Sequence, residues 1–584
     1  MKKEFLAMTI EGPEVEPIVH NGADIEAMID MVKNAGLMND DPWLFKYVTE
    51  SLASGGFEIG LESRKAIIKR RNMQTTLREK IEITKWLMEK IKSGYVWGPM
   101  KEEVATKAVG GVISQAPMGA VPKKGGKIRP IMNLSAEVKG ISINSQIPEK
   151  NKKIKYLSFK ELVRLVFSTG IGGWLFAVDA KEAYMQVPVA RDDWRFLGVR
   201  WLNRLCIFIC LCFGLASAPK IYTHFADAIE HVICQSDPEL FGCSKGAIQL
   251  LRHYLDDFVG GASKKSLADK QFQLVLECFR LMGIKTAPKK LKPPATTQIL
   301  LGFEFNTVEQ VVRIPKDKCD EMVKIIRRMI KKRKGRGYPQ LRKRKLAAII
   351  GKVRWASAAI YTGQAFVRRL EALIYTGGTV RWGHRVKLTQ ESVKDLMWWL
   401  DAINSRIYNG FDLKFILKRE QDGDIVIYTD AASTLGMGWV SSTGHWFQMS
   451  WDDFEDIAGF RPIDIMAQEM MAVALAVAAL AIYLPGKSLK VFCDNMGCVE
   501  SLIRKRCVLR RDDCMDLIRK ICLKAVEHQF YFWVEWVPTD DNKLADGLSR
   551  LVENPLAAKQ DDFVHEPFNE SGVDASETIR EWFG

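Results

Sequence analysis

The segments Trp174-Leu175-Phe176-Ala177-Val178-Asp179 and Tyr254-Leu255-Asp256-Asp257 decide how this chain folds. The first is an apolar run that ends in a carboxylate, which predicts a buried β-strand with an acid at its end. The second lies between apolar stretches within 250–261, and taken alone it is typical of an acidic hairpin turn. If the two strands are neighbours, Asp179 and Asp256 converge at one end of a sheet.

Converging carboxylates imply a cation. Adjacent negative charges repel each other, so the arrangement is costly unless cations bind between them. Hard oxygen ligands with open positions suit Mg²⁺, which keeps waters and takes substrate phosphates. Two such ions can activate an attacking 3′-hydroxyl and stabilise a leaving pyrophosphate. If the strands are neighbours, the sequence therefore predicts a divalent-cation site at this end of the sheet.

Length, composition and charge bound the class of protein. The chain has 584 residues, which is about four structural units at roughly 150 residues each. Hydrophobic residues make up 47% and charged residues 27%, which excludes a mostly disordered, collagen-like or disulfide-stapled chain. With 85 Lys+Arg against 70 Asp+Glu, the net charge is +15, which suits a polyanionic partner such as nucleic acid.

Cysteine usage and hydropathy predict a soluble protein of a reducing compartment. None of the 12 cysteines precedes Cys206 and no Cys-x-x-Cys pair occurs, so we expect neither a zinc knuckle nor a disulfide framework. The N-terminus lacks the apolar region of a signal peptide. The longest apolar stretch, Met470 to Leu484, is shorter than a membrane span needs, so we expect no membrane contact.

Around the first two segments, an ordered series of motifs resembles the reverse transcriptases. The stretch 121–130, Val-Pro-Lys-Lys-Gly-Gly-Lys-Ile-Arg-Pro, resembles the fingers hairpin. The resemblance implies that Lys124 (or Lys123) and Arg129 hold the incoming triphosphate, a task that suits cations because arginine grips phosphate bidentately. It also implies that Asp179, Asp256 and Asp257 bind two Mg²⁺ ions, with Mn²⁺ as a substitute.

Further motifs complete this resemblance. Tyr184, five residues after Asp179, matches the bulky steric gate that excludes a ribose 2′-hydroxyl, and the stretch from Phe213 and Gly214 to Pro219 matches the nucleotide-pocket motif. Later matches are a motif in 283–290, where Lys289 or Lys290 would give a proton to pyrophosphate, and a primer grip at Leu300-Leu301-Gly302-Phe303, with Leu301 and Gly302 on nucleic acid. Phe213 departs from the glutamine of many retroviral enzymes, and Leu300 from a common phenylalanine.

A second set of carboxylates follows a different pattern of elements. We expect strands at 425–432, 435–440, 445–449, 489–495 and 530–537, each read from its apolar pattern. Glu469 opens a helix that is apolar nearly all round over 470–484, which is most often a core helix packed on a sheet. Two strands end in acids, Asp430 and Asp494, and Asp546 follows the last strand.

The order of these elements resembles ribonuclease H over residues 424–550. The resemblance implies that Asp430, Glu469, Asp494 and Asp546 bind two metal ions that activate water against an RNA phosphodiester. Val537-Pro538-Thr539 stands where many of these enzymes carry a loop histidine, so we expect slower cleavage.

Between the two sets of carboxylates, residues 316–420 are mostly helical in pattern and strongly basic. Lys324 to Lys345 contains twelve Lys/Arg and no carboxylate. The run Lys331-Lys332-Arg333-Lys334 is expected to grip nucleic-acid backbone. A solvated face and a nuclear-import signal are the alternatives.

We therefore predict an α+β and α/β multidomain chain: a right-hand polymerase with fingers, palm and thumb, followed by a ribonuclease H-like domain. The predicted parts are a helical N-terminal extension (1–95), fingers and palm (96–315), a basic helical thumb (316–420), ribonuclease H (421–550) and a loose acidic tail (551–584). Expected partners are RNA template, DNA primer, RNA–DNA hybrid and dNTPs, in the cytoplasm, an element-encoded particle or the nucleus. Stretches 94–100 and 545–550 resemble elements that integrate by tyrosine recombinase, and a gypsy-like or pararetroviral element is the alternative source. The alternative to an enzyme is a domesticated or subunit-type protein that binds nucleic acid without catalysis.

Overall fold

The computed structural model is a mixed α/β protein that divides into two compact units. One comprises Met1–Leu301 with Asn306–Glu309, and the other comprises Gly302–Phe305 with Gln310–Gly584. The structure describes residues 1–14, 16–17, 23–69, 71–122, 128–243, 248–331, 338, 340–375, 378, 380–405, 409–417, 423–507, 511–552 and 572–583.

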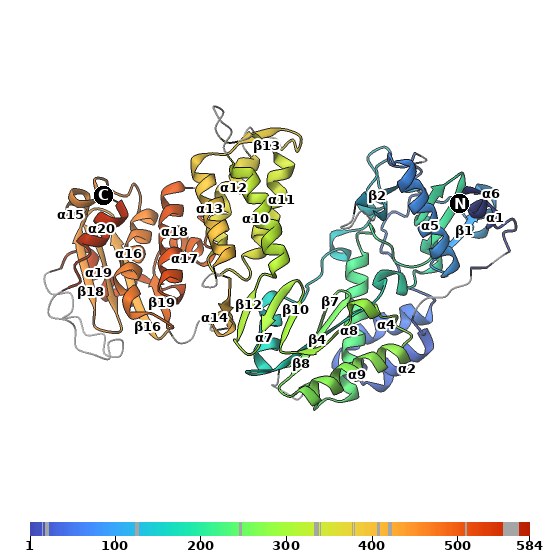
Figure 1. Ribbon diagram of the computed structural model, residues 1–584, viewed down its shortest axis with the longest axis horizontal. Helices are drawn as coiled ribbons and strands as arrows, with labels where there is room; N and C mark the ends of the chain where they lie inside the picture. The colour runs from blue at the N-terminus through green and yellow to red at the C-terminus, as the bar shows by residue number, and fades with distance from the viewer. Residues whose placement is uncertain are drawn as a thin grey trace. The chain divides into compact units, whose positions relative to one another are not determined.

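The first unit is built around a four-stranded sheet with the strand order β7-β8-β4-β9. Its central strands are β4 (Trp174–Asp179) and β8 (Asp257–Ala262), flanked by β7 (Leu251–Tyr254) and β9 (Lys292–Ala295). Helix α8 (Ala218–Ser236) contacts β7, and α9 (Lys265–Leu281) contacts β4 and β8 (Figure 1). The apolar residues of β4 are buried on both faces, which is why its sequence does not alternate.

The N-terminal helices, which lie in the predicted helical extension, belong to the core of this unit. Phe5, Met28 and Leu52 are buried in the same hydrophobic cluster as Phe176 and Phe258 of the sheet. Each short amphipathic helix must bury its apolar stripe against another element, and the sheet and its helices provide that element. These helices are α1 (Lys2–Ala7), α2 (Ile25–Asn34), α3 (Leu37–Asp40), α4 (Pro42–Ala53) and α5 (Leu77–Lys92).

Two smaller sheets complete the first unit. The strands β2 (Met118–Pro122) and β3 (Ile128–Met132) form the antiparallel hairpin that the sequence predicts, and a three-stranded sheet has the order β1-β6-β5. A capping box, in which Ser158 and Glu161 exchange hydrogen bonds, starts α7. The other elements are β1 (Val96–Met100), α6 (Glu102–Ala108), α7 (Phe159–Ser168), β5 (Gly198–Trp201), β6 (Arg204–Phe208) and β10 (Thr297–Leu300).

The basic region of the second unit is mainly helical, as expected. They are α10 (Lys316–Ile330), α11 (Lys343–Ala356), α12 (Arg368–Tyr375), α13 (Gln390–Asn404) and α14 (Leu413–Leu417). Two antiparallel pairings were not foreseen, because strands of two or three residues are too short to leave a periodic signal: β13 (Gln340–Arg342) with β14 (Arg385–Lys387), and β12 (Val311–Arg313) with β15 (Phe411–Asp412). The strand β11 (Phe303–Asn306) has residues in both units.

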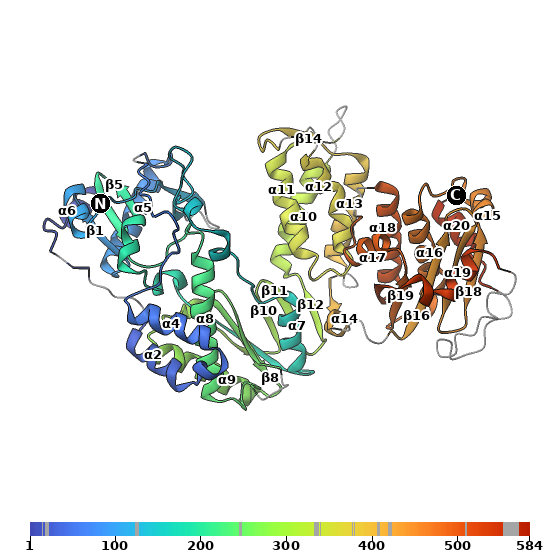
Figure 2. The ribbon, with the colours of Figure 1, turned by 180° about the vertical axis from the view of Figure 1, so that it is seen from behind.

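A five-stranded sheet with the order β18-β17-β16-β19-β20 forms the rest of the second unit (Figure 2). Its strands match the five predicted ones within two residues: β16 (Ile425–Ala432), β17 (Gly436–Ser441), β18 (Trp446–Ser450), β19 (Ser488–Cys493) and β20 (Tyr531–Trp536). Because β16, β19 and β20 are parallel, their carboxyl ends meet at one edge. Helices here are α15 (Trp451–Ala458), α16 (Ile465–Leu480), α17 (Met496–Ile503), α18 (Asp512–Glu527) and α19 (Lys543–Ser549).

One helical segment in the described ranges is long and apolar enough to cross a membrane. It is Ile465–Tyr483, with 19 residues and a mean hydropathy of 2.0. The segment begins before the expected apolar stretch, because the Asp464 carboxylate caps it by accepting from the Ala467 amide at 3.0 Å. Of its most apolar part, 78% is buried, and α16 contacts β16 and α18. Core packing therefore accounts for its hydropathy.

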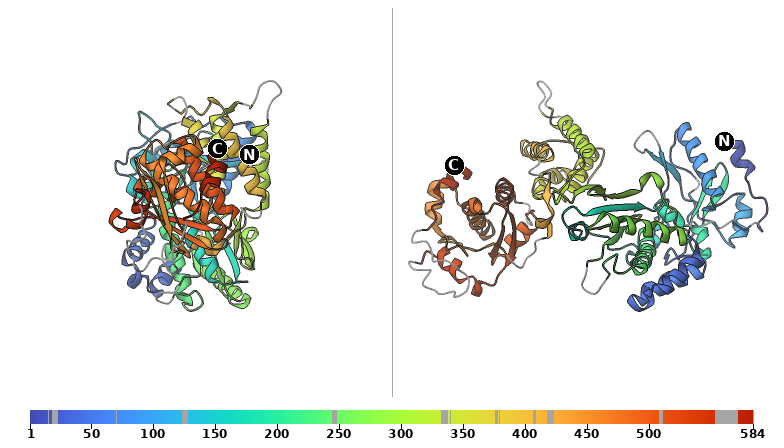
Figure 3. Two further views of the ribbon diagram at one scale, coloured as in Figure 1. Left: turned by 90° about the vertical axis from the view of Figure 1, so that its left-hand side faces the viewer. Right: turned by 60° about the horizontal axis from the view of Figure 1, so that its bottom comes forward.

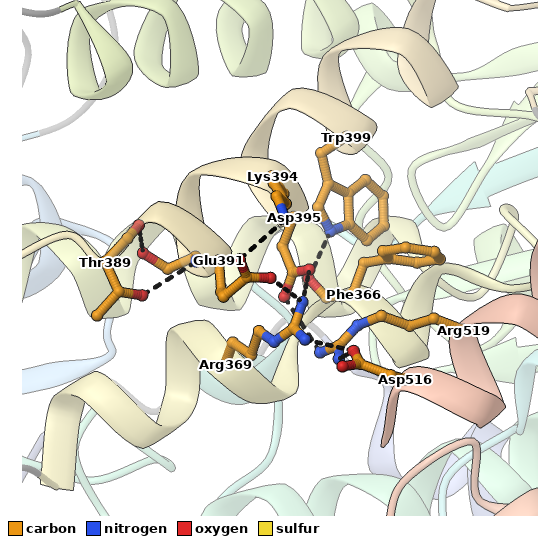
Figure 4. Close-up of polar contacts among 10 residues, drawn as sticks. Phe366, Arg369, Thr389, Glu391, Lys394, Asp395, Trp399, Asp516 and Arg519 are labelled. Atoms are coloured by element: carbon orange, nitrogen blue, oxygen red, sulfur yellow. Dashed lines mark hydrogen bonds and ion pairs between the residues drawn. The ribbon is translucent and has the colours of Figure 1, made fainter. Parts of the chain in front are cut away.

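Buried ion pairs join α12 and α13 to α18 (Figure 4). Asp395 is almost fully buried and accepts from Arg369 and from Arg519, each at 3.4 Å. Asp516 accepts from the same two arginines. Burial raises the pKa of Asp395 to about 6, although both guanidinium groups lower it.

The C-terminal segment contains a docked helix, which corrects the prediction of a loose tail. Helix α20 (Ser576–Phe583), drawn in red in Figure 3, contacts α15 and α16. Ile579 is fully buried, and the Phe583 ring lies 5.6 Å from that of Phe460. This helix was not predicted because the segment is acidic and has only a few apolar residues, which lie on one face of the helix.

Candidate functional sites

Asp179, Asp256 and Asp257 converge at one end of the first unit's sheet. Asp179 ends β4 and stands directly opposite Asp257, the first residue of β8. Asp256 lies in the turn from β7 to β8, where Leu255 has a φ of 50°. The Asp256 carbonyl accepts from the Ala180 amide at 2.9 Å. The convergence predicted from the sequence is confirmed by this register.

This cluster concentrates negative charge in a buried place. Asp179 is 6% exposed; its Oδ2 accepts from Lys290 Nζ at 2.7 Å, and within the described residues nothing hydrogen-bonds to its buried Oδ1. Burial and the charge of Asp179 raise the pKa of Asp256. Burial and the charges of Asp256 and Asp179 raise the pKa of Asp257 to about 6. The arrangement favours a bound cation.

A cavity of about 500 Å³ opens beside the carboxylates. Its lining combines acids, cations and aromatic rings, as a pocket for a charged, ring-bearing ligand requires. The predicted site residues among its lining are Arg129, Asp179, Tyr184, Phe213, Asp256 and Lys290.

Aromatic rings form one wall of this cavity. The half-buried Tyr184 ring lies 5.3 Å from the Phe213 ring and 5.6 Å from the Tyr222 ring, centroid to centroid. The Arg129 guanidinium lies 5.6 Å from the Phe213 centroid, within the range of a cation–π contact. Burial raises the pKa of Tyr184 to about 12, so its hydroxyl stays neutral. The predicted gate residue lines the same cavity as Asp179 and Asp256.

Gly214 and Asn144 fix the loop that carries Phe213. Gly214 has a φ of 105°, and a Cβ there would lie 2.3 Å from the Met132 carbonyl oxygen, so only glycine fits. Asn144 Nδ2 donates to the Gly214 carbonyl at 2.8 Å, and its Oδ1 accepts from the Ala216 amide at 2.9 Å. Asn144 was missed, because a lone asparagine 70 residues away gives no sequence signal.

The structure distinguishes the two lysines of the 283–290 motif. Lys290 reaches Asp179, whereas Lys289 is exposed and does not line the cavity. Of the predicted triphosphate contacts, Arg129 lies on β3 opposite Val121, and Lys124 lies outside the described residues.

The predicted nucleic-acid contacts are only partly described. Leu301 is half-buried with a φ of 46°, and the Gly302 carbonyl accepts from Lys318 Nζ at 2.9 Å. Lys331 is exposed just after α10. Lys332, Arg333 and Lys334 lie outside the described residues.

Helix α5 contributes two residues that sequence reasoning missed, Trp86 and Lys90, which line the cavity. The available signal was the periodicity of α5: its buried positions include Ile83, Leu87 and Lys90. A lysine is rarely buried unless it is paired with an acid, so the position of Lys90 on the buried face could have identified it as a paired residue.

In the second unit, Asp430 is placed by a close approach between β16 and α19. Asp430 is 5% exposed and stands opposite Gly438 of β17. A Cβ on Gly438 would lie 2.4 Å from the Leu548 Cβ, so glycine lets α19 reach the sheet. Ser549 Oγ then donates to Asp430 Oδ2 at 2.5 Å. Burial, with the nearby acids, raises the pKa of Asp430 to about 6.

Glu469, Cys493 and Asp494 form a compact group at the carboxyl end of β19. One ligand atom from each lies within 4.8 Å of the others, which meets the spacing for a metal ion. Glu469 lies in the second turn of α16 rather than at its start, and burial raises its pKa well above the ordinary range. Cys493, whose Sγ lies 3.7 Å from Glu469 Oε2, was not predicted.

Asp494 and Asp546 are each held by a neighbour. Thr539 Oγ1, in the loop without the histidine, donates to Asp494 Oδ2 at 2.8 Å. Arg550 Nε donates to both Asp546 oxygens at 2.9 Å, one helical turn away. Asp546 also contributes to the raised pKa of Asp430, so the four predicted acids lie around one edge of the sheet.

No known sequence family matches the chain, and no curated protein matches it. Among solved structures, the chain is similar to those of the foamy viral protease-reverse transcriptase. With the dRH form bound to ds DNA, identity is 14%, coverage 89% of this chain and 83% of that chain, and TM-score 0.47. The complex with RNA/DNA hybrid is 13% identical, with 94% of this chain and 65% of that chain covered and a TM-score of 0.48. The complex with dsDNA is 16% identical, with 87% of this chain and 96% of that chain covered and a TM-score of 0.42. Because identity and TM-score are low, we base the functional proposal on the geometry of this chain.

Proposed function

We propose that the chain is a reverse transcriptase with ribonuclease H activity, which copies RNA and DNA templates into DNA and cleaves RNA in RNA–DNA hybrids. The observation that carries the proposal is that each unit has its own set of converging carboxylates at a sheet end. In the first unit they adjoin a cavity with an arginine and an aromatic wall, which suits a nucleoside triphosphate.

Both donor sets fit Mg²⁺. They consist mainly of carboxylate oxygens, the ligands of hard cations, and Asp179 Oδ1 is a buried oxygen without a partner in the described residues. Asp179, Asp256 and Asp257 would hold the ions in the first unit, and Asp430, Glu469, Asp494 and Asp546 those in the second. When bound, such ions activate the attacking oxygen and stabilise the leaving group.

The chain's own residues bind and select the nucleotide. Arg129 can grip phosphate oxygens with its planar fork. Tyr184, backed by Phe213, leaves no room for a ribose 2′-hydroxyl and so discriminates by steric exclusion. Lys290 Nζ carries a proton next to Asp179, where a leaving pyrophosphate can take it.

In the second unit, hydroxyl groups orient Asp494 and Asp430, and Arg550 orients Asp546. Thr539 cannot exchange a proton near neutral pH as a histidine does, so we propose that cleavage is slow. The source would be a retroelement or pararetrovirus, and the protein would act in the cytoplasm, an element-encoded particle or the nucleus. Assignment to tyrosine-recombinase elements rests on residues 94–100 and 545–550 alone.

One experiment tests the proposal: primer extension on an RNA template and cleavage of a labelled hybrid, each with Mg²⁺ and with Mn²⁺. Asp257→Asn should abolish extension and leave cleavage, and Asp494→Asn should do the converse, because the acids lie in different units. Loss of both activities in one folded variant would contradict separate sites. Hybrid binding by wild type without either activity would favour a domesticated, non-catalytic subunit.

A further inference from the structure

Helix α5 places a buried lysine in the wall of the cavity beside Asp179. Lys90 is 2% exposed, and its Nζ donates to Glu182 and, at 3.1 Å, to Glu89 Oε1. An ammonium is costly to bury unless it is paired and hydrogen-bonded. Burial would lower the pKa of Lys90, but Glu182 and Glu89 raise it above the ordinary value, so Lys90 is charged.

The partner of Lys90, Glu182, lies where the backbone turns between the end of β4 and the segment that carries Tyr184. Glu182 lies between Asp179 and Tyr184 and has a left-handed backbone, φ 55° and ψ 36°. Residues other than glycine keep such a conformation where their surroundings fix it. The Glu182 carbonyl accepts from the Met185 amide at 2.7 Å, at the start of the 3-10 turn that carries Tyr184. Lys90 thus holds the residue at which the backbone turns from the carboxylate toward the aromatic wall.

Hydrogen bonds extend this contact to the 283–290 loop. The Lys181 amide donates to the Lys285 carbonyl at 2.8 Å, and Gln186 Nε2 donates to the Lys181 carbonyl at 2.6 Å. Lys285 Nζ in turn donates to Tyr95 Oη at 3.1 Å, and Lys90 Nζ lies 5.8 Å from the Tyr95 ring centroid. Three segments that line the cavity, α5, the 180–186 turn and the 283–290 loop, are therefore joined to one another.

We propose that Lys90 is a positioning residue for nucleotide selection: through Glu182 it fixes the turn that presents Tyr184 to the incoming sugar. This inference rests on the proposed polymerase function. Glu182 is 28% exposed, so without the ammonium its carboxylate can turn to water, and the fold survives while the turn loses its anchor. Asp179 and Asp257 keep their strand register, so the chemical step is affected less than the choice of nucleotide.

The test is single-nucleotide incorporation by Lys90→Met, with dNTP and the matching rNTP measured separately. Losing a charge-assisted hydrogen bond of about 1.5–3 kcal/mol should lower the dNTP/rNTP ratio of kcat/KM about tenfold or more, since 1.4 kcal/mol is tenfold. The dNTP KM should rise more than kcat falls. Lys90→Arg should retain the ratio, and Lys92→Met, an exposed lysine of the same helical turn, should leave it unchanged.

Two further variants separate positioning from folding. Glu182→Gln should lower the ratio as Lys90→Met does, and the exchange Lys90→Glu with Glu182→Lys should restore part of it, which a purely structural role would not predict. A wild-type ratio and KM in folded Lys90→Met, or in Glu182→Gln if the first variant does not fold, would overturn the inference. If wild type incorporates no nucleotide, the proposed function itself fails, and the inference fails with it.

Discussion

Replacing Tyr184 by alanine should open the cavity to ribonucleotides while the protein stays folded. The Tyr184 ring is only half-buried and makes two aromatic contacts, with Phe213 and with Tyr222. Each such pair contributes about 0.5–1.5 kcal/mol, so losing both costs about 1–3 kcal/mol. A domain is stabilised by roughly 5–15 kcal/mol, so Tyr184→Ala should melt earlier but still fold.

The effect on selectivity can be estimated from packing. Forcing extra atoms into a filled site costs about 1–3 kcal/mol, and each 1.36 kcal/mol in a barrier is tenfold in rate, so the dNTP/rNTP preference should fall about 5- to 150-fold. The measurement is kcat/KM for dNTP and for rNTP beside a melting curve. Tyr184→Phe keeps the ring and serves as the matched control.

Two results would refute this reasoning. A folded Tyr184→Ala protein with an unchanged ratio would place the gate elsewhere. A loss of stability of about 3–5 kcal/mol, the usual cost of truncating a fully buried aromatic ring, would mean that Tyr184 is a core residue.

Three other changes probe the second unit. The pKa of Asp395, about 6 in the fold against an ordinary 3.8, means that ionising it opposes folding; the free energy of unfolding should fall by up to about 3 kcal/mol as pH rises from 4 to 7. Urea titrations at several pH values should show that the free energy of unfolding depends less on pH in D395N than in wild type. An equal pH dependence in the two proteins would contradict the raised pKa of Asp395. Gly438→Ala should displace α19 at Leu548, costing about 1–3 kcal/mol and abolishing hybrid cleavage but not extension, and normal cleavage would exclude that displacement. Neutralising residues 331–334 should reduce the salt dependence of primer–template binding by up to about 0.9 per lost phosphate contact on a log–log plot, and an unchanged slope would favour a solvated face.

The strands that carry acids could be predicted from the sequence, because their signals are local. An apolar run that ends in a carboxylate, such as 174–179 or 489–494, indicates both the strand and the place where it ends from adjacent residues. The pairing of Asp179 with Asp257 then follows, since neighbouring strands of opposite direction bring one end together.

The supporting contacts could not be predicted, because they join distant residues without a pattern. Lys90 and Glu182 are 92 positions apart, and Ser549 and Asp430 are 119 apart. Helix α20 was hidden for a related reason, since its docking depends on aromatic partners such as Phe454 and Phe460. A single sequence gives side-chain identity, but such partners emerge only when the chain is folded.

The shared core of the first unit has a consequence for synthesis on the ribosome. Phe5 near the N-terminus and Ile284 belong to one hydrophobic cluster, so the cluster cannot close until residue 284 has left the exit tunnel. At a synthesis rate of roughly 5–20 residues per second, the apolar faces of the nascent N-terminal helices therefore stay exposed for about 15–60 s. Translation speed and chaperone supply should therefore limit the yield of active protein.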